Sequence, residues 1–399
     1  MSKNVKILIL NSGSSSIKYQ VINMPSEQLV CKGIIERIGQ ESSIIEYESE
    51  KAKFKTSESI PDHKIGLHKI VDKLLDPDYG IIKRTEEIDI VGHRVVHGGN
   101  SFSDTSIITD QVKQQIEQYA SLAPLHNPHN LSGINLAEEL FPLSKQVAVF
   151  DTAFHQTIPT KAKKYAIPNE LYEKHGIQVY GFHGTSHKYV SEQAIKYLKL
   201  KSSKIISVHL GNGCSMTAVV NGKSVDHSFG FAPTNGLIMG TRSGDIDHSI
   251  IFYLTETLGY KSKEVNDLLI NKSGMLGLTG HSDLRDIQAG AIAGKEDCIL
   301  ALQMNAYRIR KYIGSYIAAM NGVDAIVFTG GIGENSSVLR KLVLEDMAFF
   351  GIHMDENKNK LNTGKIQEID ASLSKVALLV VPTNEELEIA RQAFLKFEK

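Results

Sequence analysis

Short runs of branched apolar residues recur along the chain, and each run ends at a turn that contains Gly, Asn, Asp or Pro. The runs are residues 7–10, 88–91, 147–150, 205–210, 325–328 and 376–381. Runs of this length and composition are typical of buried strands. Because several of them are followed by amphipathic stretches, the pattern predicts an α/β fold with largely buried strands.

Amphipathic stretches beside capping residues predict helices between and after these strands. The expected helices are 187–200 after Ser186, 299–320 before the Asn321-Gly322 pair, 336–350 after Asn335, and 385–397 after Asn384. The polar region 41–62 shows no such pattern, and we expect it to be an exposed excursion.

Two segments about 200 residues apart share one pattern of strand, small-residue turn and second strand. The first covers residues 7–21 and the second covers residues 205–220. A repeated hairpin at this spacing predicts a duplicated fold with one hairpin in each half.

Composition restricts the classes of function that the chain could have. A length of 399 residues indicates two or three domains. With 44 basic and 45 acidic residues, the chain has no net positive charge to attract nucleic acid or an anionic membrane. The three cysteines are scattered and odd in number, which favours a reducing cytoplasm. The first apolar run is too short for a targeting signal or a membrane span, so we expect neither.

Three glycine-containing turns follow predicted strands, at residues 11–18, 211–213 and 329–335. Small residues leave backbone N–H groups open to an oxyanion, and the third turn leads into a helix N-terminus. It lacks the Gly-Lys-Ser/Thr of a Walker loop and the third glycine of a dinucleotide motif. The first two turns could each be an ordinary hairpin turn. The three together favour a bound nucleotide.

Candidate charged groups lie beside the predicted strands. Arg94, Arg242 and Arg285 lie among small residues, where a guanidinium fork suits a carboxylate or a phosphate. For Arg285 an ion pair with Asp283 or Asp286 is an equal alternative. Asp151 directly follows residues 147–150, at the strand end where open α/β sheets place catalytic or Mg²⁺-organising groups, with a helix cap as the alternative.

Two classes of hydrolase, the zinc proteases and the glycoside hydrolases, are less favoured by the histidines and acidic residues of the chain. His183 and His187 have i,i+4 spacing but no adjacent Glu, and Gly184 weakens a helix there, so the zinc-protease motif is not met. His126 and His129 lie in what reads as a Pro-bounded loop. Asp245 and Asp247 could form a carboxylate pair, but the phosphate-type turns argue for different chemistry.

Ten sequence blocks occur in one order from near the first residue to near the last, and with them the chain resembles the acetate and propionate kinase family of the actin/sugar-kinase/Hsp70-like superfamily. The blocks are LNSGSSSIKY (10–19), GHRVVHGG (92–99), LAPLHNP (122–128), FDTAFHQT (150–157), YGFHGTSH (180–187), HLGNG (209–213), MGTRSGDID (239–247), SDLRD (282–286), GGIGEN (330–335) and PTNEE (382–386).

The resemblance implies a duplicated actin-like (ribonuclease H-like) fold, with two domains around an ATP cleft. The expected domains are residues 1–151, completed by the helix 385–399, and residues 152–384. The implied activity is reversible transfer of the ATP γ-phosphoryl group to acetate, giving acetyl phosphate and ADP by direct in-line transfer. It would depend on Mg²⁺, with Mn²⁺ as a substitute, in a cytoplasmic homodimer. Propionate kinase, a switching ATPase and a sugar kinase remain alternatives.

The resemblance also assigns site residues, position by position. Catalytic roles fall to Arg94, Asp151, His183 and Arg242, and Mg²⁺ would be held by Asn11 and Glu385. The acyl substrate would contact Arg94, Val96, Leu125, Phe182 and Pro233. ATP would contact Ser14, Ser16, Lys18, His209, Leu210, Gly211, Asn212, Gly213, Asp283, Leu284, Arg285, Gly331, Ile332, Gly333, Glu334 and Asn335.

One region departs from the family's usual pattern. Residues 226–235 read DHSFGFAPTN where the family more often reads DTSMGFTPLE or DTSMGFTPLA, and His248 replaces a common proline. Both sites adjoin the expected acyl pocket and Arg242, so the preferred acyl chain and the rate are left open.

Overall fold

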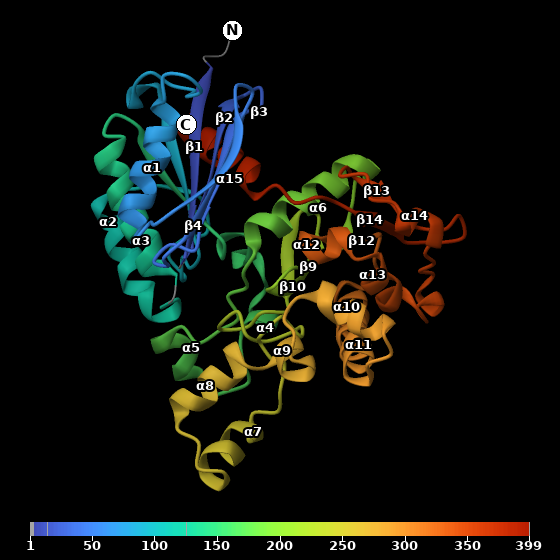
Figure 1. Ribbon diagram of the computed structural model, residues 1–399. Coiled ribbons are helices and arrows are strands. Elements are labelled where there is room, and N and C mark those ends of the chain that lie inside the picture. Colours follow the sequence, from blue (N-terminus) through green and yellow to red (C-terminus); the bar gives the residue numbers. More distant parts are fainter. Residues whose placement is uncertain (1–3, 14, 125, 399) are drawn as a thin grey trace. The chain divides into compact units, whose positions relative to one another are not determined.

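The computed structural model describes residues 4–13, 15–124 and 126–398, so Ser14 and Leu125 of the expected site lie outside the described residues. The chain divides into two compact units. Unit 1 consists of Met1–Phe154 and Asn384–Lys399, and unit 2 consists of His155–Thr383. Figure 1 shows the elements of both.

Unit 1 is built on a mixed sheet whose described strands run in the order β5-β4-β3-β2-β1-β6-β8-β7. Its elements are β1 (Val5–Ser12), β2 (Ser16–Met24), β3 (Gln28–Glu36), β4 (Ser43–Ser49), β5 (Lys53–Glu58), α1 (His63–Leu75), η1 (Thr85–Glu87), β6 (Ile90–Val95), β7 (Ser106–Ile107), α2 (Asp110–Gln118), η2 (Tyr119–Leu122), α3 (Asn127–Leu140), β8 (Lys145–Phe150) and α15 (Glu385–Phe397). Strands β1, β6 and β8 are parallel, and β1, β2 and β3 are antiparallel.

Helices cover both faces of the central strands of this sheet (Figure 1). Leu8 and Leu10 of β1 pack in a core with residues of α1 and α3, whereas Ile7 and Ile9 pack against Ile389 and other residues of α15. Alternate residues of one strand thus reach two cores. This arrangement explains why the sequence of β1 is a continuous apolar run instead of an alternating one.

Unit 2 contains a second mixed sheet, with the described strands in the order β11-β10-β9-β12-β14-β13. Its elements are α4 (Thr160–Lys163), α5 (Asn169–His175), α6 (Gly184–Leu198), β9 (Lys204–Leu210), β10 (Cys214–Val220), β11 (Lys223–His227), α7 (Ser249–Phe252), the π-helical η4 (Tyr253–Thr257), α8 (Ser262–Asn271), α9 (Gly274–Thr279), α10 (Leu284–Ile292), α11 (Glu296–Met320), β12 (Ala325–Thr329), α12 (Gly330–Asn335), α13 (Ser337–Leu344), η5 (Ala348–Phe350), α14 (Glu356–Lys360), β13 (Gln367–Glu368) and β14 (Ala377–Val380). The short helix η3 (Ala153–Thr157) spans the division between the units.

The two sheets repeat one topology. In unit 1 the order β3-β2-β1-β6-β8 combines an antiparallel hairpin with parallel strands, and in unit 2 the order β11-β10-β9-β12-β14 does the same. The hairpins β1-β2 and β9-β10 are the two repeated segments of the sequence. The α/β class and the duplicated actin-like fold are therefore confirmed.

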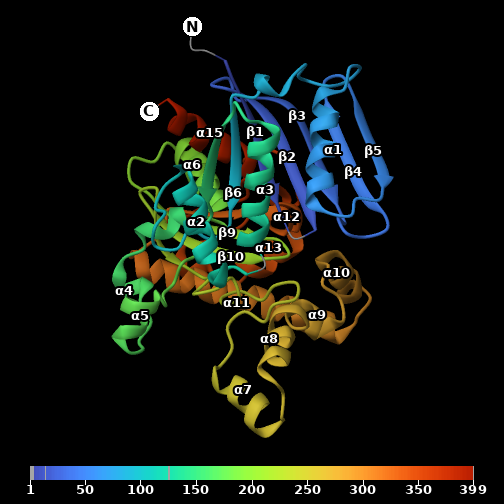
Figure 2. The same cartoon turned by 90° about the vertical axis from the view of Figure 1, so that its left-hand side faces the viewer.

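Several local expectations are wrong. The region 41–62 is not simply an exposed excursion, because it forms β4, which has buried positions, and β5, and these strands continue the sheet beside β3 (Figure 2). Ser186 does not cap a helix, since α6 begins at Gly184 and the Ser186 side chain is buried within it. His129 is not in a loop but in the first turn of α3.

The expected helix 336–350 is also wrong at both ends. The residue that caps α13 is Ser336, whose side chain accepts a hydrogen bond from the Leu339 N–H, and the helix ends at Leu344. In contrast, α11 ends at Met320 with a left-handed Asn321, and the Asn384 side chain caps α15, as the sequence predicts. No helix in the described ranges is both long and apolar enough to span a bilayer.

Candidate functional site

A group of polar side chains gathers at one edge of the unit 1 sheet. Asn11 lies near the end of β1, Arg94 lies near the end of β6, and Asp151 directly follows β8. These three strands are parallel, so their carboxyl ends meet at the same edge. Glu385, the first residue of α15, reaches the same group from the C-terminal segment.

Arg94 connects the members of this group. Its Nη2 forms a close ion pair with the buried Asp151 carboxylate, and its Nη1 donates to the Asn11 Oδ1 at 3.4 Å. The Arg94 Nε lies 4.0 Å from the Glu385 Oε2, is itself buried, and makes no hydrogen bond within the described ranges. Among the described residues, two of the five guanidinium N–H groups of Arg94 make hydrogen bonds, and the other three are left for a further acceptor.

The local charge balance favours an additional cation. Burial raises the pKa of Glu385 to about 7; Arg94 and Lys18 oppose this shift, and the negative charges of Asp151 and Glu386 add to it. Lys18 already pairs with Glu386, with 2.6 Å between Nζ and Oε1. Glu385 therefore ionises less readily than an ordinary carboxyl group, and a nearby cation would favour its charged form.

The donor set of this group fits Mg²⁺. Asn11 and Glu385 supply the amide and carboxylate oxygens that this hard cation prefers, and Mg²⁺ is commonly held by one or two carboxylates together with substrate phosphates. In the described part of the chain no group of three or more His, Cys, Asp or Glu residues could hold a metal ion by itself.

A second group lies in unit 2 around Gly213, the last residue of the turn between β9 and β10. A Cβ atom at Gly213 would lie 3.4 Å from the His183 ring and 3.7 Å from the Arg242 Nη1. The glycine therefore has an imidazole and a guanidinium close beside it. Arg242 is oriented by its Nη1, which donates to the Pro233 carbonyl at 2.9 Å.

Hydroxyl groups link the His183 ring to a second, fully buried histidine. The Ser215 Oγ lies 2.9 Å from the His183 Nδ1 and 2.8 Å from the His187 Nε2. On its other side, the His187 Nδ1 lies 2.8 Å from the Ser207 Oγ. Burial lowers the pKa of His187 well below its ordinary value, so this ring is neutral near pH 7. The Ser215 hydroxyl thus fixes the His183 ring at its Nδ1.

A hollow of about 710 Å³ in unit 2 collects half of the residues expected to bind ATP. Its volume suits a nucleotide-sized ligand. It is lined by Gly211, Asn212, Ser282, Asp283, Leu284, Arg285, Gln288, Gly331, Ile332, Asn335 and Ser336. Three separate chain segments, each containing one of the expected motifs, therefore converge on one concave surface.

The Arg285 side chain makes the ion pair that the sequence left open. Its Nη2 lies 2.5 Å from the Asp283 Oδ2, and this contact lowers the pKa of Asp283 to about 2. The guanidinium remains exposed to solvent at the mouth of the hollow. Arg285 thus both forms a structural ion pair with Asp283 and lines the hollow.

The remaining residues expected to bind ATP lie elsewhere. Leu210 is buried in the core, His209 lies against the His183 ring, and Gly213 is beside His183 and Arg242. Glu334 braces its own loop, since its Oε1 accepts hydrogen bonds from the N–H groups of Gly330 and Thr383. The positions that do not line the hollow are Ser16, Lys18, His209, Leu210, Gly213, Gly333 and Glu334.

The described acyl-pocket residues divide between the units. Val96 is buried at the end of β6 in unit 1, close to Arg94 in the sequence. Phe182 is buried in unit 2, directly before His183, and Pro233 is half-buried and accepts from Arg242.

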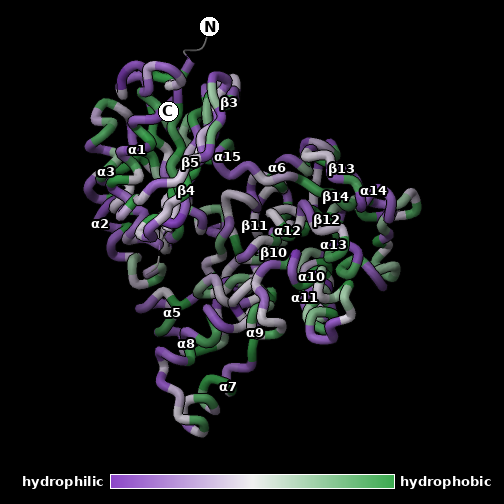
Figure 3. The backbone as a smooth tube through the Cα atoms, viewed as in Figure 1, coloured by the Kyte–Doolittle hydropathy of each residue, from purple (hydrophilic) through white to green (hydrophobic). Residues whose placement is uncertain are grey.

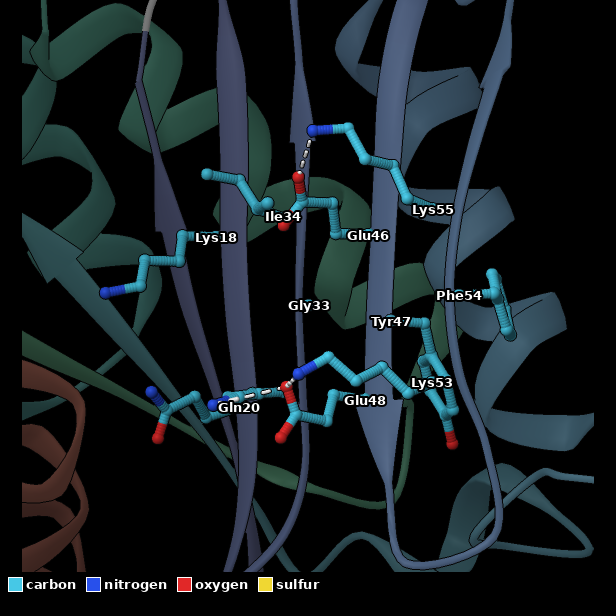
Figure 4. Close-up of a pocket in the computed structure, with 11 residues that line it drawn as sticks. Lys18, Gln20, Gly33, Ile34, Glu46, Tyr47, Glu48, Lys53, Phe54 and Lys55 are labelled. Atoms are coloured by element: carbon cyan, nitrogen blue, oxygen red, sulfur yellow. Dashed lines mark ion pairs between the residues drawn. The ribbon is translucent and has the colours of Figure 1, made fainter.

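Another hollow, of about 450 Å³, lies on the exposed face of β2–β5 (Figure 4). Its charged side chains pair across neighbouring strands. Lys55 contacts Glu46 at 2.7 Å and Lys53 contacts Glu48 at 3.0 Å. Because these pairs neutralise much of its charge, we regard this surface as a solvated sheet face.

Some residues of the site were not predicted from the sequence. Ser215 and His187 orient His183, Glu386 adds negative charge near Glu385, and Arg340 holds the end of α12. His187 and Glu386 do lie inside the motif blocks, so their positions carried a signal. Ser215 and Arg340 are typical of ordinary strand and helix residues, and only the fold shows their contacts.

Comparison with known proteins identifies the family. Residues 6–391 match the profile of the Acetokinase family. An acetate kinase of Flavobacterium johnsoniae is 60% identical over 394 residues, which cover 99% of this chain and 100% of that protein. An acetate kinase of Halothermothrix orenii is 51% identical, over 97% of this chain and 98% of its own length. The chain therefore belongs to the Acetokinase family, and the resemblance seen in the sequence blocks is confirmed.

Solved structures agree with this assignment. The crystal structure of Porphyromonas gingivalis acetate kinase matches with a TM-score of 0.92 and 45% identity, over 98% of this chain and 100% of that one. A propionate kinase from Francisella tularensis matches with a TM-score of 0.92 and 42% identity, over 98% and 99%.

Proposed function

We propose that this protein is an acetate kinase, which transfers the γ-phosphoryl group of ATP to the carboxylate of acetate and forms ADP and acetyl phosphate, reversibly and in a single in-line step. One observation carries the proposal: Arg94, Asp151, Asn11 and Glu385 lie together at one sheet edge in a chain of the Acetokinase family. The names of its full-length relatives support the same activity.

The chemistry of the acceptor decides which groups matter. A small carboxylic acid, with a pKa of about 4, is already ionised at neutral pH, so there is little work for a general base. The obstacle is the approach of one anion to a polyanion. Catalysis should therefore depend on positioning and on neutralising charge, as in other phosphoryl transfers.

The side chains present can meet this requirement. We propose that Arg94 binds the acceptor carboxylate through its remaining N–H groups, with the apolar Val96 two residues further along the chain. Arg242 and His183 would bind the transferring phosphoryl group. Asp151 would hold the Arg94 fork in place, because its carboxylate is already engaged by that guanidinium.

Asn11 and Glu385 are the residues that we propose to hold Mg²⁺, or Mn²⁺ in its place. The ion would supply positive charge to the nucleotide phosphates. The nucleotide itself would lie in the hollow lined by Gly211, Asp283 and Gly331, with Ser16 and Lys18 facing its phosphates.

A hydroxamate assay tests this function. Acyl phosphates react with hydroxylamine, so ATP, Mg²⁺ and each of formate, acetate, propionate and butyrate are supplied in turn. We expect acetate to give the highest kcat/KM, with propionate next, because one methylene changes binding by only about 1–3 kcal/mol. ATP hydrolysis that needs no acid and traps no hydroxamate would instead indicate a switching ATPase, and phosphorylation of an alcohol would indicate a sugar kinase.

We further propose that the protein is a cytoplasmic homodimer. Its three cysteines are buried thiols, which suits a reducing compartment. In unit 2 the segment 249–260, which contains α7 and η4, exposes apolar side chains, and Figure 3 shows hydrophobic residues along it. The exposed residues are Ile250, Ile251, Phe252, Tyr253, Leu258 and Tyr260. An exposed group of this kind is typical of a protein interface.

Sedimentation velocity tests the dimer. Phe252→Glu is expected to shift the protein to monomer at micromolar concentration. Leu143→Glu, at an exposed leucine of unit 1, is the matched control and should leave the dimer intact. A wild-type protein that sediments as a monomer would contradict the proposal.

A further inference from the structure

The loop that leads into His183 has an unusual backbone. Gly181 has φ +74° and His183 has φ +56°, so both lie in the left-handed region on either side of Phe182. For His183, which carries a Cβ, this conformation is disfavoured and needs support from its surroundings. The loop therefore requires contacts that hold it in place.

Two histidines supply such contacts to the peptide groups on either side of Phe182. The Phe182 N–H donates to the His227 Nε2 at 3.1 Å. The Phe182 carbonyl lies 3.0 Å from the His155 Nε2. The first contact fixes the peptide group between Gly181 and Phe182, and the second fixes the peptide group that leads into His183.

The chemistry of the partners determines the tautomer of each ring. A carbonyl only accepts, so the His155 Nε2 carries a hydrogen. A backbone amide only donates, so the His227 Nε2 is bare and its hydrogen is on Nδ1, where it is donated to the Thr217 Oγ1 at 2.8 Å. The two rings thus present opposite groups, an N–H from His155 and a bare nitrogen from His227, and each suits the group that it faces.

Packing makes this arrangement rigid. Both rings are buried, and their centroids are 4.1 Å apart. A Cβ at position 181 would lie 2.6 Å from the His155 ring, so only glycine allows that ring to approach. Burial, with smaller contributions from neighbouring histidines, lowers the pKa of His227 well below its ordinary value. The His227 Nε2 therefore remains an unprotonated acceptor at neutral pH.

We propose that His227 and His155 are positioning residues for phosphoryl transfer: they clamp the two peptide groups around Phe182 and so hold the His183 ring and the Phe182 side chain in their working positions. This inference rests on the proposed function.

Two amide substitutions separate the contacts of His227. In His227→Gln the side-chain amide reaches the position of Nε2 and can still accept from the Phe182 N–H. In His227→Asn the amide reaches only the position of Nδ1, so it keeps the Thr217 contact and loses the Phe182 contact. Each variant loses one hydrogen bond, and neither titrates, so the pair is matched in polarity and in expected thermal stability.

The expected result is a difference in kcat between the two variants at similar Tm. A displaced loop should lower the kcat of His227→Asn by about 10- to 100-fold, since small misplacements of reacting groups are costly. His227→Gln should stay within about 3-fold of wild type, in line with a single neutral hydrogen bond. The KM for ATP should change less than kcat in both, because the nucleotide hollow does not include this loop.

Hydrogen exchange of the Phe182 amide gives a second measurement that does not depend on activity. We expect it to be slow in wild type and in His227→Gln, and fast in His227→Asn. Equal kcat losses in both variants, or equal protection of the Phe182 amide, would overturn the clamp. A wild type without acetate-dependent transfer would defeat the proposed function instead, and the exchange data would still decide whether the contact exists.

Discussion

Arg94 contacts two carboxylates and an amide through three different nitrogens of one guanidinium group. Nη2 pairs with Asp151, Nη1 donates to Asn11, and Nε faces Glu385. A lysine ammonium has no such planar fork and could not keep all three directions at once. At this position the planar geometry of the guanidinium group therefore matters more than its charge.

The same reasoning gives a prediction for Arg242. Arg242→Lys keeps the charge but loses the fork that is oriented by the Pro233 carbonyl. We expect kcat to fall roughly 10²-fold or more, the scale of one lost transition-state donor. Initial rates of acetyl phosphate formation at saturating ATP and acetate measure this. Arg84→Lys, at an exposed arginine of unit 1, is the control and should change kcat little; near wild-type turnover in Arg242→Lys would disprove the role.

Among the secondary-structure elements, those that carry an uninterrupted apolar run were the ones that the sequence predicted well. β1, β9 and β12 are buried on both faces over most of their length, so most of their positions are apolar. β4 and β5 were missed because they alternate with charged residues on an exposed face, which resembles a polar loop. The cap of α6 was misplaced because a left-handed His183, which no propensity rule anticipates, begins that helix.

The site was predictable only in part for a related reason. Glycine turns and strand ends marked Asn11, Asp151 and Gly331 by local pattern, but their partners come from distant segments. Arg94 and Glu385 are almost 300 residues apart, and only the parallel strand order and the return of α15 bring them together. The family resemblance supplied that pairing, whereas spacing alone did not.

Arg340 shows how one buried side chain joins two elements near the nucleotide hollow. It is 1% exposed, and its guanidinium donates to the carbonyls of Gly333 and Glu334 in α12 and to both oxygens of Asn359 in α14. Burial lowers the pKa of Arg340 to about 10, which still leaves it charged at neutral pH. The end of α12 is thus held by a cation that pairs with no carboxylate in the described part of the chain.

We therefore expect Arg340→Lys to leave several of these acceptors unsatisfied. The loss should be about 2–4 kcal/mol of stability, and the KM for ATP should rise because α12 borders the hollow. Thermal unfolding and ATP kinetics measure the two effects. Arg310→Lys is a suitable control, since Arg310 also donates to helix carbonyls but is partly exposed. An unchanged KM for ATP would contradict the link between Arg340 and the hollow.

At the scale of the whole molecule, buried neutral histidines make the fold sensitive to acid. Burial lowers the pKa of His93 and His97 to about 4, and it lowers the pKa of His187 and His227 well below the ordinary value. At a pH near 6.5 these histidines therefore bind protons in the unfolded chain but not in the folded chain. Stability should fall as the pH drops below about 6.5, by up to about 1.4 kcal/mol per pH unit for each histidine.

Two carboxyl groups act in the opposite sense. Burial raises the pKa of Asp226 and Glu385, so the folded chain takes up protons there more readily than the unfolded chain does. Since four histidines outnumber them, Tm should still fall between pH 6.5 and 5. His93→Gln should reduce that slope, and His248→Gln, at an exposed histidine, should not. A Tm that is constant or rising as the pH falls through this range would show the prediction to be wrong.

The central claim is that this protein brings two anions together by positioning and charge neutralisation, without removing a proton from the acceptor. The pH dependence of kcat in Asp151→Asn tests it most directly. We expect a low kcat across pH 6 to 10, roughly 10² below wild type, with an unchanged profile, because Asp151 serves to hold Arg94. Recovery of kcat at high pH, through an ionisation that replaces a missing base, would contradict the account.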